Sequence, residues 1–267
     1  MLIGVEPLLH AGPHAYLRAG AQMAFMTIPI GWRQRSAFTS THATMRGRCV
    51  VAVLCAVGDT ACVNFLAHLV LAPQTPEGLV GSIAPDMIRG PLPKDLDPAV
   101  MSAAKEHYRI DRFTDAHRAF DRTRGRLGVL VGKRLSGILA DVLYDHVLAR
   151  DWAQWRDDGF AAYLADTEAS LVDALPHVPV RMQVIVRKMI DEQWLASYAT
   201  ADGIRARLET MSQRLTHRLE RPMSLLISEK ELAEQDKLLT QDFSHLWPDL
   251  LGHVDEGRKD QGNRLAS

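Results

Sequence analysis

The sequence predicts an all-α protein, an antiparallel helical bundle, over residues 63–250. From Val63 onward, long helix-compatible stretches alternate with short breaks rich in proline, glycine and aspartate. The apolar-polar alternation typical of strands is absent, and clusters of β-branched residues are few. Helices of roughly sixteen residues or more, joined by short loops, are typical of bundles.

The first elements follow from caps and breaks. Asn64 is an N-cap candidate for a helix over 64–72, which the proline-containing stretch 73–77 ends. A short helix is expected over 79–88 and a loop over 89–98, where Asp97 and Pro98 supply the N-cap and first residue of the next helix. Further helices are expected at 98–114, 117–133, 135–150, 160–175, 179–198, 204–219 and from about 224 onward, before a flexible tail at 251–267.

Residues 1–62 differ from the rest of the chain. They contain no lysine, only two acidic residues (Glu6 and Asp59), and all three cysteines, at 49, 55 and 62. A targeting segment, a disordered extension and an upstream stretch that is not translated are all compatible with this composition. We expect a poorly ordered extension with a mis-assigned start.

Composition limits the classes of function. The net charge of −1 gives no global attraction to nucleic acid, and the longest apolar run, 50–57, is far shorter than the roughly 20 residues of a membrane helix. Without cysteine after position 62, a metal must be held there by His, Asp and Glu, which favours a hard or borderline divalent ion. A reducing, cytoplasmic location is expected.

Four segments concentrate residues that can bind a metal. They are Asn64 with His68, Asp86 after an apolar turn, His107 with Asp111 and Asp115 at four-residue spacing, and Asp141 with Asp145 and His146. Taken singly, the asparagine and several aspartates could be helix caps, and His68 could be a hydrogen-bonded core residue.

The fourth segment is harder to explain as structure alone. Apolar residues surround Asp141 and Asp145, and burying two carboxylates on one helical face is costly unless a positive charge neutralises them. A divalent cation or an ion-pair network with arginines such as Arg109 could do so. Carboxylates and imidazoles that hold metal suit hydrolysis of a phosphate ester, and no P-loop, Gly-x-Gly-x-x-Gly or Gly-x-Ser-x-Gly motif suggests other chemistry.

The order of these motifs resembles the acyl carrier protein phosphodiesterase family. The stretches that carry the resemblance are 64–69 (Asn-Phe-Leu-Ala-His-Leu), Gly81 to Gly90, His107 to Asp115, Asp141 to Leu148, Glu192 to Tyr198 and Phe243 to Pro248. Two departures lie at Ser82, where the family often has Asn or Asp, and at Pro85. Family chains typically begin with Met just before Asn-Phe-Leu-Ala-His, which suggests that Val63 is the true start, encoded by GUG.

The resemblance implies an HD-domain-like fold and a bound Mn²⁺, or another divalent cation such as Mg²⁺ or Fe²⁺. It implies Asp86, His107, Arg109 and Asp111 as catalytic residues, with Arg109 on phosphate. The metal ligands that it implies are His68, Asp86, Asp111, Asp145 and His146.

The implied reaction is hydrolysis of the phosphodiester between 4′-phosphopantetheine and a serine of holo-acyl carrier protein. This acidic partner would dock on basic residues around Arg118, Arg122 and Arg126, in a stretch, 105–134, with five more basic than acidic side chains. The same surface could be a solvated charged face, and it lacks the aromatic residues of a nucleic-acid site. The alternatives are a phosphohydrolase of a nucleotide or another small phosphodiester, and a non-enzymatic helical interaction protein.

Overall fold

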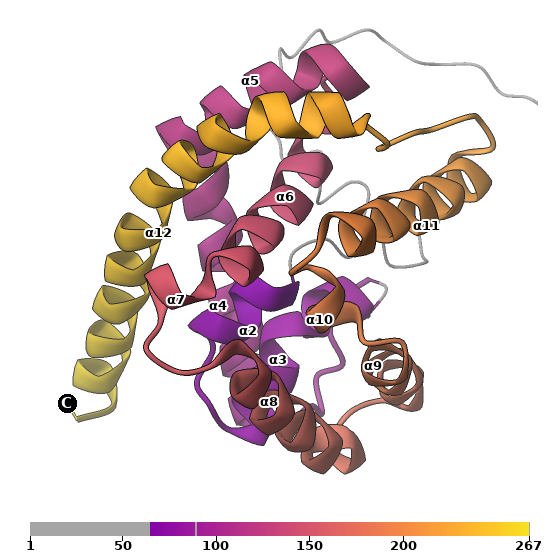
Figure 1. Cartoon of the computed structure of the whole chain (residues 1–267). Helices are drawn as coiled ribbons and strands as arrows, with labels where there is room; N and C mark the ends of the chain where they lie inside the picture. The colour runs from indigo at the N-terminus through magenta and orange to yellow at the C-terminus, as the bar shows by residue number, and fades with distance from the viewer. Residues whose placement is uncertain (1–64, 89, 267) are drawn as a thin grey trace, which may run out of the picture. The chain divides into compact units, whose positions relative to one another are not determined.

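The computed structural model describes residues 65–88 and 90–266, and these residues contain no β-strand (Figure 1). The α-helices are α2 (Phe65–Leu71), α3 (Pro76–Met87), α4 (Pro98–Ala116), α5 (Arg118–Val131), α6 (Ser136–Arg150), α7 (Trp152–Trp155), α8 (Phe160–Ala174), α9 (Val180–Asp191), α10 (Trp194–Ser197), α11 (Ala201–Leu219) and α12 (Glu229–Ala266), and a 3-10 turn, η1 (Leu175–His177), follows α8. The prediction of an all-α protein is confirmed. Asn64, Arg89 and the extension at 1–62 lie outside the described residues.

Side-chain caps explain where the first helices begin. Thr75 accepts a hydrogen bond from the Gly78 backbone and starts α3, and Asp97 accepts one from Ala99 and starts α4. His117 both ends α4 and caps α5, because its Nδ1 accepts a hydrogen bond from the Ala119 backbone at 3.2 Å. A single residue therefore makes the corner between α4 and α5.

Two of the expected helices are different in the structure. The single helix predicted over 179–198 is wrong, because Gln193 has a φ of 51° and this left-handed backbone separates α9 from α10. The last helix begins later than expected, at Glu229. Ser228 and Glu231 form a reciprocal capping box there, in which the Ser228 backbone donates to the Glu231 carboxylate at 2.7 Å and the Glu231 backbone donates to Ser228 Oγ.

The stretch expected as a flexible tail is the last part of α12. The helix runs through Ala266, the Val254 side chain is buried, and the Arg258 guanidinium donates a hydrogen bond to the Leu71 carbonyl. Among the described residues, no helix is long and apolar enough to cross a membrane.

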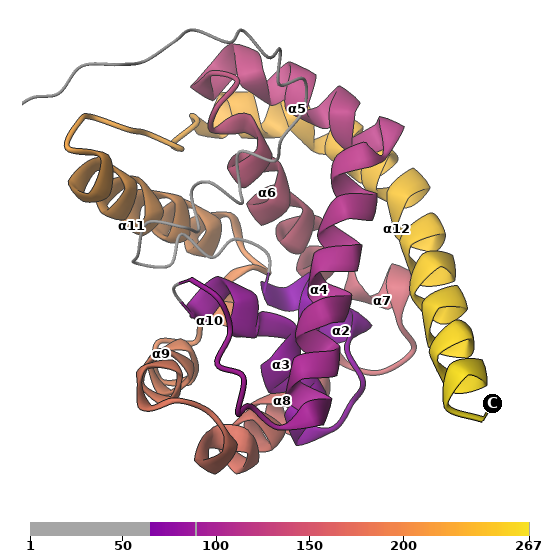
Figure 2. The same cartoon turned by 180° about the vertical axis from the view of Figure 1, so that it is seen from behind.

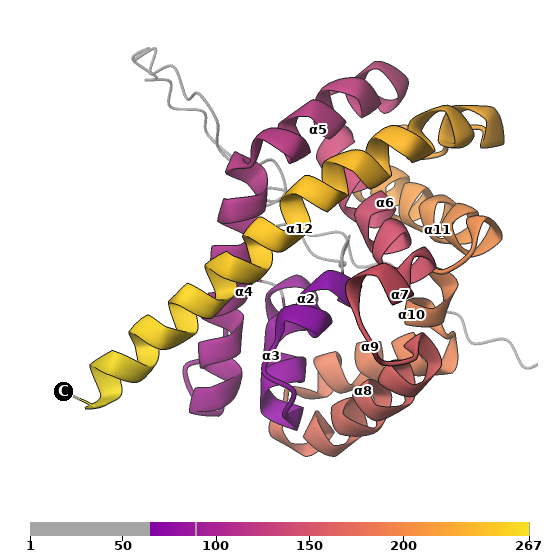
Figure 3. The same cartoon turned by 60° about the vertical axis from the view of Figure 1, so that its left-hand side comes forward.

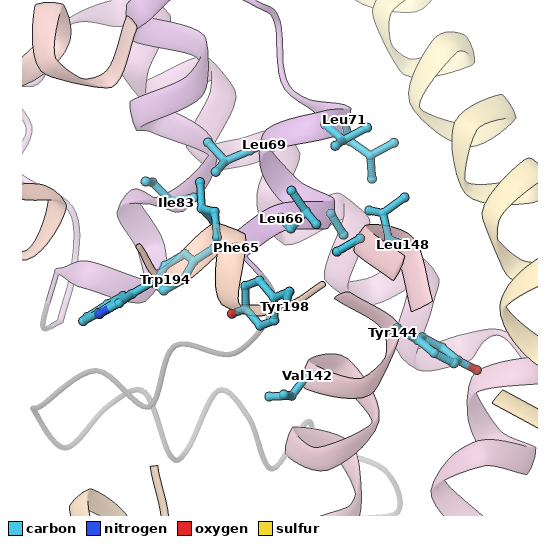
Figure 4. Packing of buried hydrophobic residues seen from close by; sticks show 14 of the residues in the cluster. Phe65, Leu66, Leu69, Leu71, Ile83, Val142, Tyr144, Leu148, Trp194 and Tyr198 are labelled. Atoms are coloured by element: carbon cyan, nitrogen blue, oxygen red, sulfur yellow. The ribbon is translucent and has the colours of Figure 1, made fainter. Parts of the chain in front are cut away.

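Helices α2 and α6 lie at the centre of the core. All seven residues of α2 are buried, and so is every residue of α6 from Ile138 to Ala149. Phe65 stacks on Trp194 at 6.2 Å between ring centroids, and Figure 4 shows Leu66 of α2 and Val142 of α6 in the same cluster. Polar side chains on α2 and α6 are consequently held in the interior.

Helices α3 and α4 lie side by side and approach closely at Gly81 (Figures 2 and 3). A Cβ atom at position 81 would lie 2.5 Å from the Val100 carbonyl oxygen and 2.8 Å from the Ala103 Cβ. Glycine at this position therefore allows the two backbones to approach to a distance that no other residue permits.

Asp242 fixes α12 against α5 and α6. Its buried carboxylate accepts hydrogen bonds from Arg122 at 2.8 Å and Thr123 at 3.1 Å and is paired with Arg126 at 2.7 Å, and Thr123 also contacts the Tyr144 hydroxyl of α6. Two of the three arginines predicted to dock a partner, Arg122 and Arg126, thus hold the helices together. This role follows from the cost of leaving a buried carboxylate unpaired.

We expect Gly81→Ala to lower the free energy of unfolding by about 1–3 kcal/mol, because the added methyl group forces α3 away from α4. Gly125→Ala in α5 is the matched control, since apart from its chain neighbours and the backbone of its own helix no atom lies within 4 Å of its added Cβ. The control should be stabilised by up to about 1 kcal/mol. Urea unfolding of both variants tests this, and equal stability of the two would contradict the close approach at Gly81.

Candidate metal centre

Two histidines and one aspartate come together between α2 and α4. Ligand atoms of His68, His107 and Asp111 all lie within 4.8 Å of one another. His68 Nε2 is 3.2 Å from one carboxylate oxygen of Asp111, and His107 Nε2 is 3.2 Å from the other. The two imidazole rings stack with their centroids 3.9 Å apart. Because His107 and Asp111 are one helical turn apart, they share a face of α4.

The backbone of α3 orients the His107 ring. His107 Nδ1 lies 2.7 Å from the Ser82 carbonyl oxygen and donates its proton there. The other nitrogen, Nε2, then faces Asp111 and lies 3.7 Å from Asp86 Oδ1. A histidine held through one nitrogen by a carbonyl is the usual arrangement for metal binding through the other.

His68 provides a test of whether a metal fits. Its side chain is 1 % exposed, and neither ring nitrogen has a hydrogen-bond partner within the described part of the chain, although Nε2 is close to Asp111. A buried polar atom without a partner is costly and rare. A metal ion would bind such a nitrogen, and two imidazoles with one carboxylate suit a borderline divalent ion, so the residues present fit a metal site.

The charges of the group are strongly coupled. Burial lowers the pKa of His107, but Asp86 and Asp111 together outweigh burial and raise it to about 9. Burial acts to raise the pKa of Asp111, yet His107 and His68 hold it well below the usual range. Burial and the neighbouring His107 both lower the pKa of His68. In the metal-free protein, an ion pair between His107 and Asp111 therefore occupies the centre.

Asp86 and Asp141 add further carboxylates beside this group. Burial raises the pKa of Asp86. Asp141, which is 9 % exposed on α6, has a pKa raised well above its usual value, first by burial and then by the charges of Asp111, Asp115, Asp145 and Asp86. A concentration of buried acids is stabilised by a cation. Asp141 was absent from the predicted ligand set, although its apolar surroundings in the sequence were the signal for it.

Asp145 of α6, a predicted ligand, contacts the first turn of α2. Its two carboxylate oxygens accept hydrogen bonds from the Leu66 and Ala67 backbone N–H groups, both at 2.9 Å. Complete burial raises its pKa to about 8, against the opposing effect of these two donors. Asp145 is not among the residues that could jointly hold a metal, and its contacts are those of an N-terminal helix cap supplied by another helix.

His146, also predicted as a ligand, faces a different region. Its Nδ1 is 2.6 Å from the Tyr198 carbonyl oxygen, and it lines a cavity of about 530 Å³ together with residues of α11 and the start of α12, among them Ile204, Leu208 and Leu232. None of the residues of the metal-binding group lines this cavity.

Arg109, the predicted phosphate contact, lies on the far side of α4 from the group. Its Nη1 donates to Glu106 at 2.7 Å, and its Nη2 is 3.5 Å from the His253 carbonyl oxygen of α12. The guanidinium also packs against Gly257 of α12. Two residues along a helix correspond to about 200°, so Arg109 points away from its neighbours His107 and Asp111.

The fold and the site define an all-α protein in which two buried histidines and a partly exposed aspartate form a group that could bind a metal. The chain belongs to the acyl carrier protein phosphodiesterase family, whose family model matches residues 63–250. The chain is similar to acyl carrier protein phosphodiesterases of Yersinia pestis (32 % identical over 152 residues), Serratia proteamaculans (31 % over 158 residues) and an Escherichia coli strain (31 % over 159 residues). Each comparison covers 57 % of this chain and 78 % of the relative. No solved structure matches the chain, and the HD-domain-like fold stays a prediction.

We expect the affinity for Mn²⁺ to rise with pH between pH 7 and about 9. The reason is that the ion must displace the proton that Asp86 and Asp111 hold on His107, whose pKa is about 9. One released proton corresponds to about a tenfold gain in affinity for each pH unit below that pKa. Calorimetric titration in buffers of different ionisation enthalpy measures the affinity and the released proton. An affinity that does not change over this range would contradict the protonated His107.

We expect Asp145→Ala to lower the free energy of unfolding by about 2–4 kcal/mol, since it leaves two buried backbone N–H groups of α2 without an acceptor. Asp166→Ala, at an exposed position of α8, is the control and should change stability by less than about 0.5 kcal/mol. Thermal unfolding with excess Mn²⁺ and without metal measures both. If Asp145 is instead a ligand, the substitution will reduce the stabilisation by metal much more than the stability of the metal-free protein.

Proposed function

We propose that the chain hydrolyses the phosphodiester linking 4′-phosphopantetheine to a serine of holo-acyl carrier protein, giving apo-acyl carrier protein and 4′-phosphopantetheine. Membership of the family over residues 63–250 supports the reaction. The observation that carries the proposal to a site is the group formed by the buried His68 and His107 and the partly exposed Asp111. We expect the reaction to take place in the cytoplasm.

His68, His107 and Asp111 would hold the divalent ion, with Asp86 and Asp141 next to them. We propose Mn²⁺, with Mg²⁺ or Fe²⁺ as the other candidates. When bound, such an ion lowers the pKa of water and neutralises charge on the phosphoryl oxygens.

The protein's own residues position the reactants and move the protons. Ser82 holds the His107 ring through its carbonyl, and burial of His68 excludes water from one side of the group. Asp86, with a side chain 11 % exposed and 3.7 Å from His107, is placed to accept a proton from the attacking water. The water oxygen bonds to phosphorus, the bond between phosphorus and the serine oxygen breaks, and Asp86 returns the proton to the serine oxygen.

An acidic partner would dock on exposed cations of α4 and the start of α5. Arg118 keeps the role predicted for it, because its side chain is exposed. Arg122 and Arg126 are tied to Asp242, so we assign the rest of the docking surface to Lys105 and Arg112, which are exposed on α4. Charge complementarity of this kind mainly raises the rate of association.

We expect the full-length protein with Mn²⁺ to reduce the mass of holo-acyl carrier protein by that of the 4′-phosphopantetheine arm. His107→Gln and Asp111→Asn should lower kcat/KM by more than about 100-fold, since even the loss of a ligand's supporting group costs about 10–100-fold. Arg187→Ala, at an exposed position of α9, is the control and should retain full activity. Mass spectrometry of the carrier protein over time is the measurement.

Other outcomes distinguish the alternatives. Metal-loaded protein that leaves the carrier protein intact but cleaves a small phosphodiester would move the substrate to that class. Folded protein that binds no metal and cleaves nothing would support an ion-paired interaction protein.

A further inference from the structure

A phosphodiester substrate brings a negative charge to the centre, and the proposed function therefore calls for a cation that contacts it. Arg109 does not meet this need, because its guanidinium is bound to Glu106 and packs on α12. Arg122 and Arg126 do not meet it either, because both bind the buried Asp242. Arg112 directs its Nε to the Tyr108 carbonyl of its own helix at 3.1 Å.

Arg124 of α5 lies beside the acidic face of α4 that carries the centre. His107, Asp111 and Asp115 follow one another at four-residue spacing, so their side chains form one stripe along α4. Arg124 Nη1 is 3.6 Å from Asp115 Oδ1, at the end of this stripe. The charge of Asp115 also acts on Asp141, which places Asp115 at the edge of the carboxylate cluster rather than apart from it.

The corner between the two helices explains this position. His117 ends α4 and begins α5 within one residue, so the first two turns of α5 stay close to the last turn of α4. Phe120 is buried one turn before Arg124, and the Arg124 guanidinium carbon lies 5.8 Å from the centre of its ring. The Arg124 side chain thus packs on the Phe120 ring, while 39 % of its surface remains exposed.

The ion pair of Arg124 is longer than those that Arg109 and Arg126 make with carboxylates. The distance of 3.6 Å to Asp115 compares with 2.7 Å between Arg109 and Glu106 and 2.7 Å between Arg126 and Asp242. A partly exposed ion pair at that distance contributes little to stability. The guanidinium can therefore exchange Asp115 for two oxygens of a phosphate group, which its planar fork binds better than an ammonium group does.

We infer that Arg124 is the substrate-binding residue that contacts the non-bridging oxygens of the scissile phosphate, with Asp115 holding its guanidinium in place between substrates. This assignment rests on the proposed function and deepens it. Arg124 takes over the role that the family resemblance had suggested for Arg109.

The test compares Arg124→Ala and Arg124→Lys in the full-length protein with Mn²⁺, on holo-acyl carrier protein and on bis(p-nitrophenyl) phosphate. Arg124→Ala should lose about 100-fold or more in kcat/KM on both substrates, as expected for one donor to a developing charge. Arg124→Lys should recover part of this loss, because it restores the charge without the fork. Free guanidinium ion, added at concentrations that do not unfold the protein, should partly restore Arg124→Ala, and bound metal and melting temperature should stay at wild-type values.

Three results would overturn the assignment. Arg124→Ala could retain activity within about threefold on both substrates, which is less than one lost phosphate contact costs. It could lose activity on the carrier protein alone, which would make Arg124 part of the docking surface. It could lose bound metal with no rescue by guanidinium, which would make its role structural. Wild-type protein that cleaves neither substrate would instead overturn the proposed function itself, and Arg187→Ala controls for loss of an exposed arginine.

Discussion

The close contact between α3 and α4 at Gly81 is the constraint on which the centre depends. Only because position 81 lacks a side chain can the next carbonyl, that of Ser82, reach His107 Nδ1 at 2.7 Å. That hydrogen bond selects the tautomer and the orientation of the ring, and thereby points Nε2 at Asp111 and Asp86. The side chain of Ser82 takes no part in this contact, since its hydroxyl donates to the Leu79 carbonyl. The departure from the family pattern at this position therefore leaves the orientation of His107 intact.

Two aspartates of α6 act on the centre, one by positioning His68 and the other by adding a carboxylate. Asp145 caps the first turn of α2, and His68 lies directly after the capped residue Ala67, so one buried carboxylate positions another helix's imidazole. Four residues earlier on α6, Asp141 carries its carboxylate into the field of Asp86 and Asp111. The two aspartates look equivalent in the sequence, yet one satisfies backbone donors and the other belongs to the acidic cluster. This division of roles explains why an apolar helix retains both.

The sequence allowed prediction of most helices and of the pairing of His107 with Asp111, because both depend on local spacing. It also singled out His68 and Asp86 as residues able to bind a metal, and the resemblance then implied that they are ligands. It failed where a contact joins distant residues. The cap that Asp145 provides spans 79 positions, and no local pattern distinguishes such a cap from a ligand. The direction of Arg109 likewise depends on α12, whose path across α4 is fixed by contacts more than 100 residues away in the chain. The capping box of Ser228 and Glu231 is a local sequence signal, and it marks the start of the last helix a few residues after the predicted one.

The residues of the centre lower the stability of the metal-free protein. Without a metal, the described core contains a histidine, His68, whose ring nitrogens have no partner beyond the contact of Nε2 with Asp111, and aspartates whose pKa values are raised by burial and by one another. Each of these features costs free energy that apolar residues in the same positions would not cost. A bound divalent ion would reverse the sign of this contribution, because it would bind the imidazoles and neutralise the carboxylates together. The same arrangement that weakens the metal-free fold would therefore give the site an affinity for a cation, and the apolar surroundings of α2 and α6 would strengthen that interaction by excluding water.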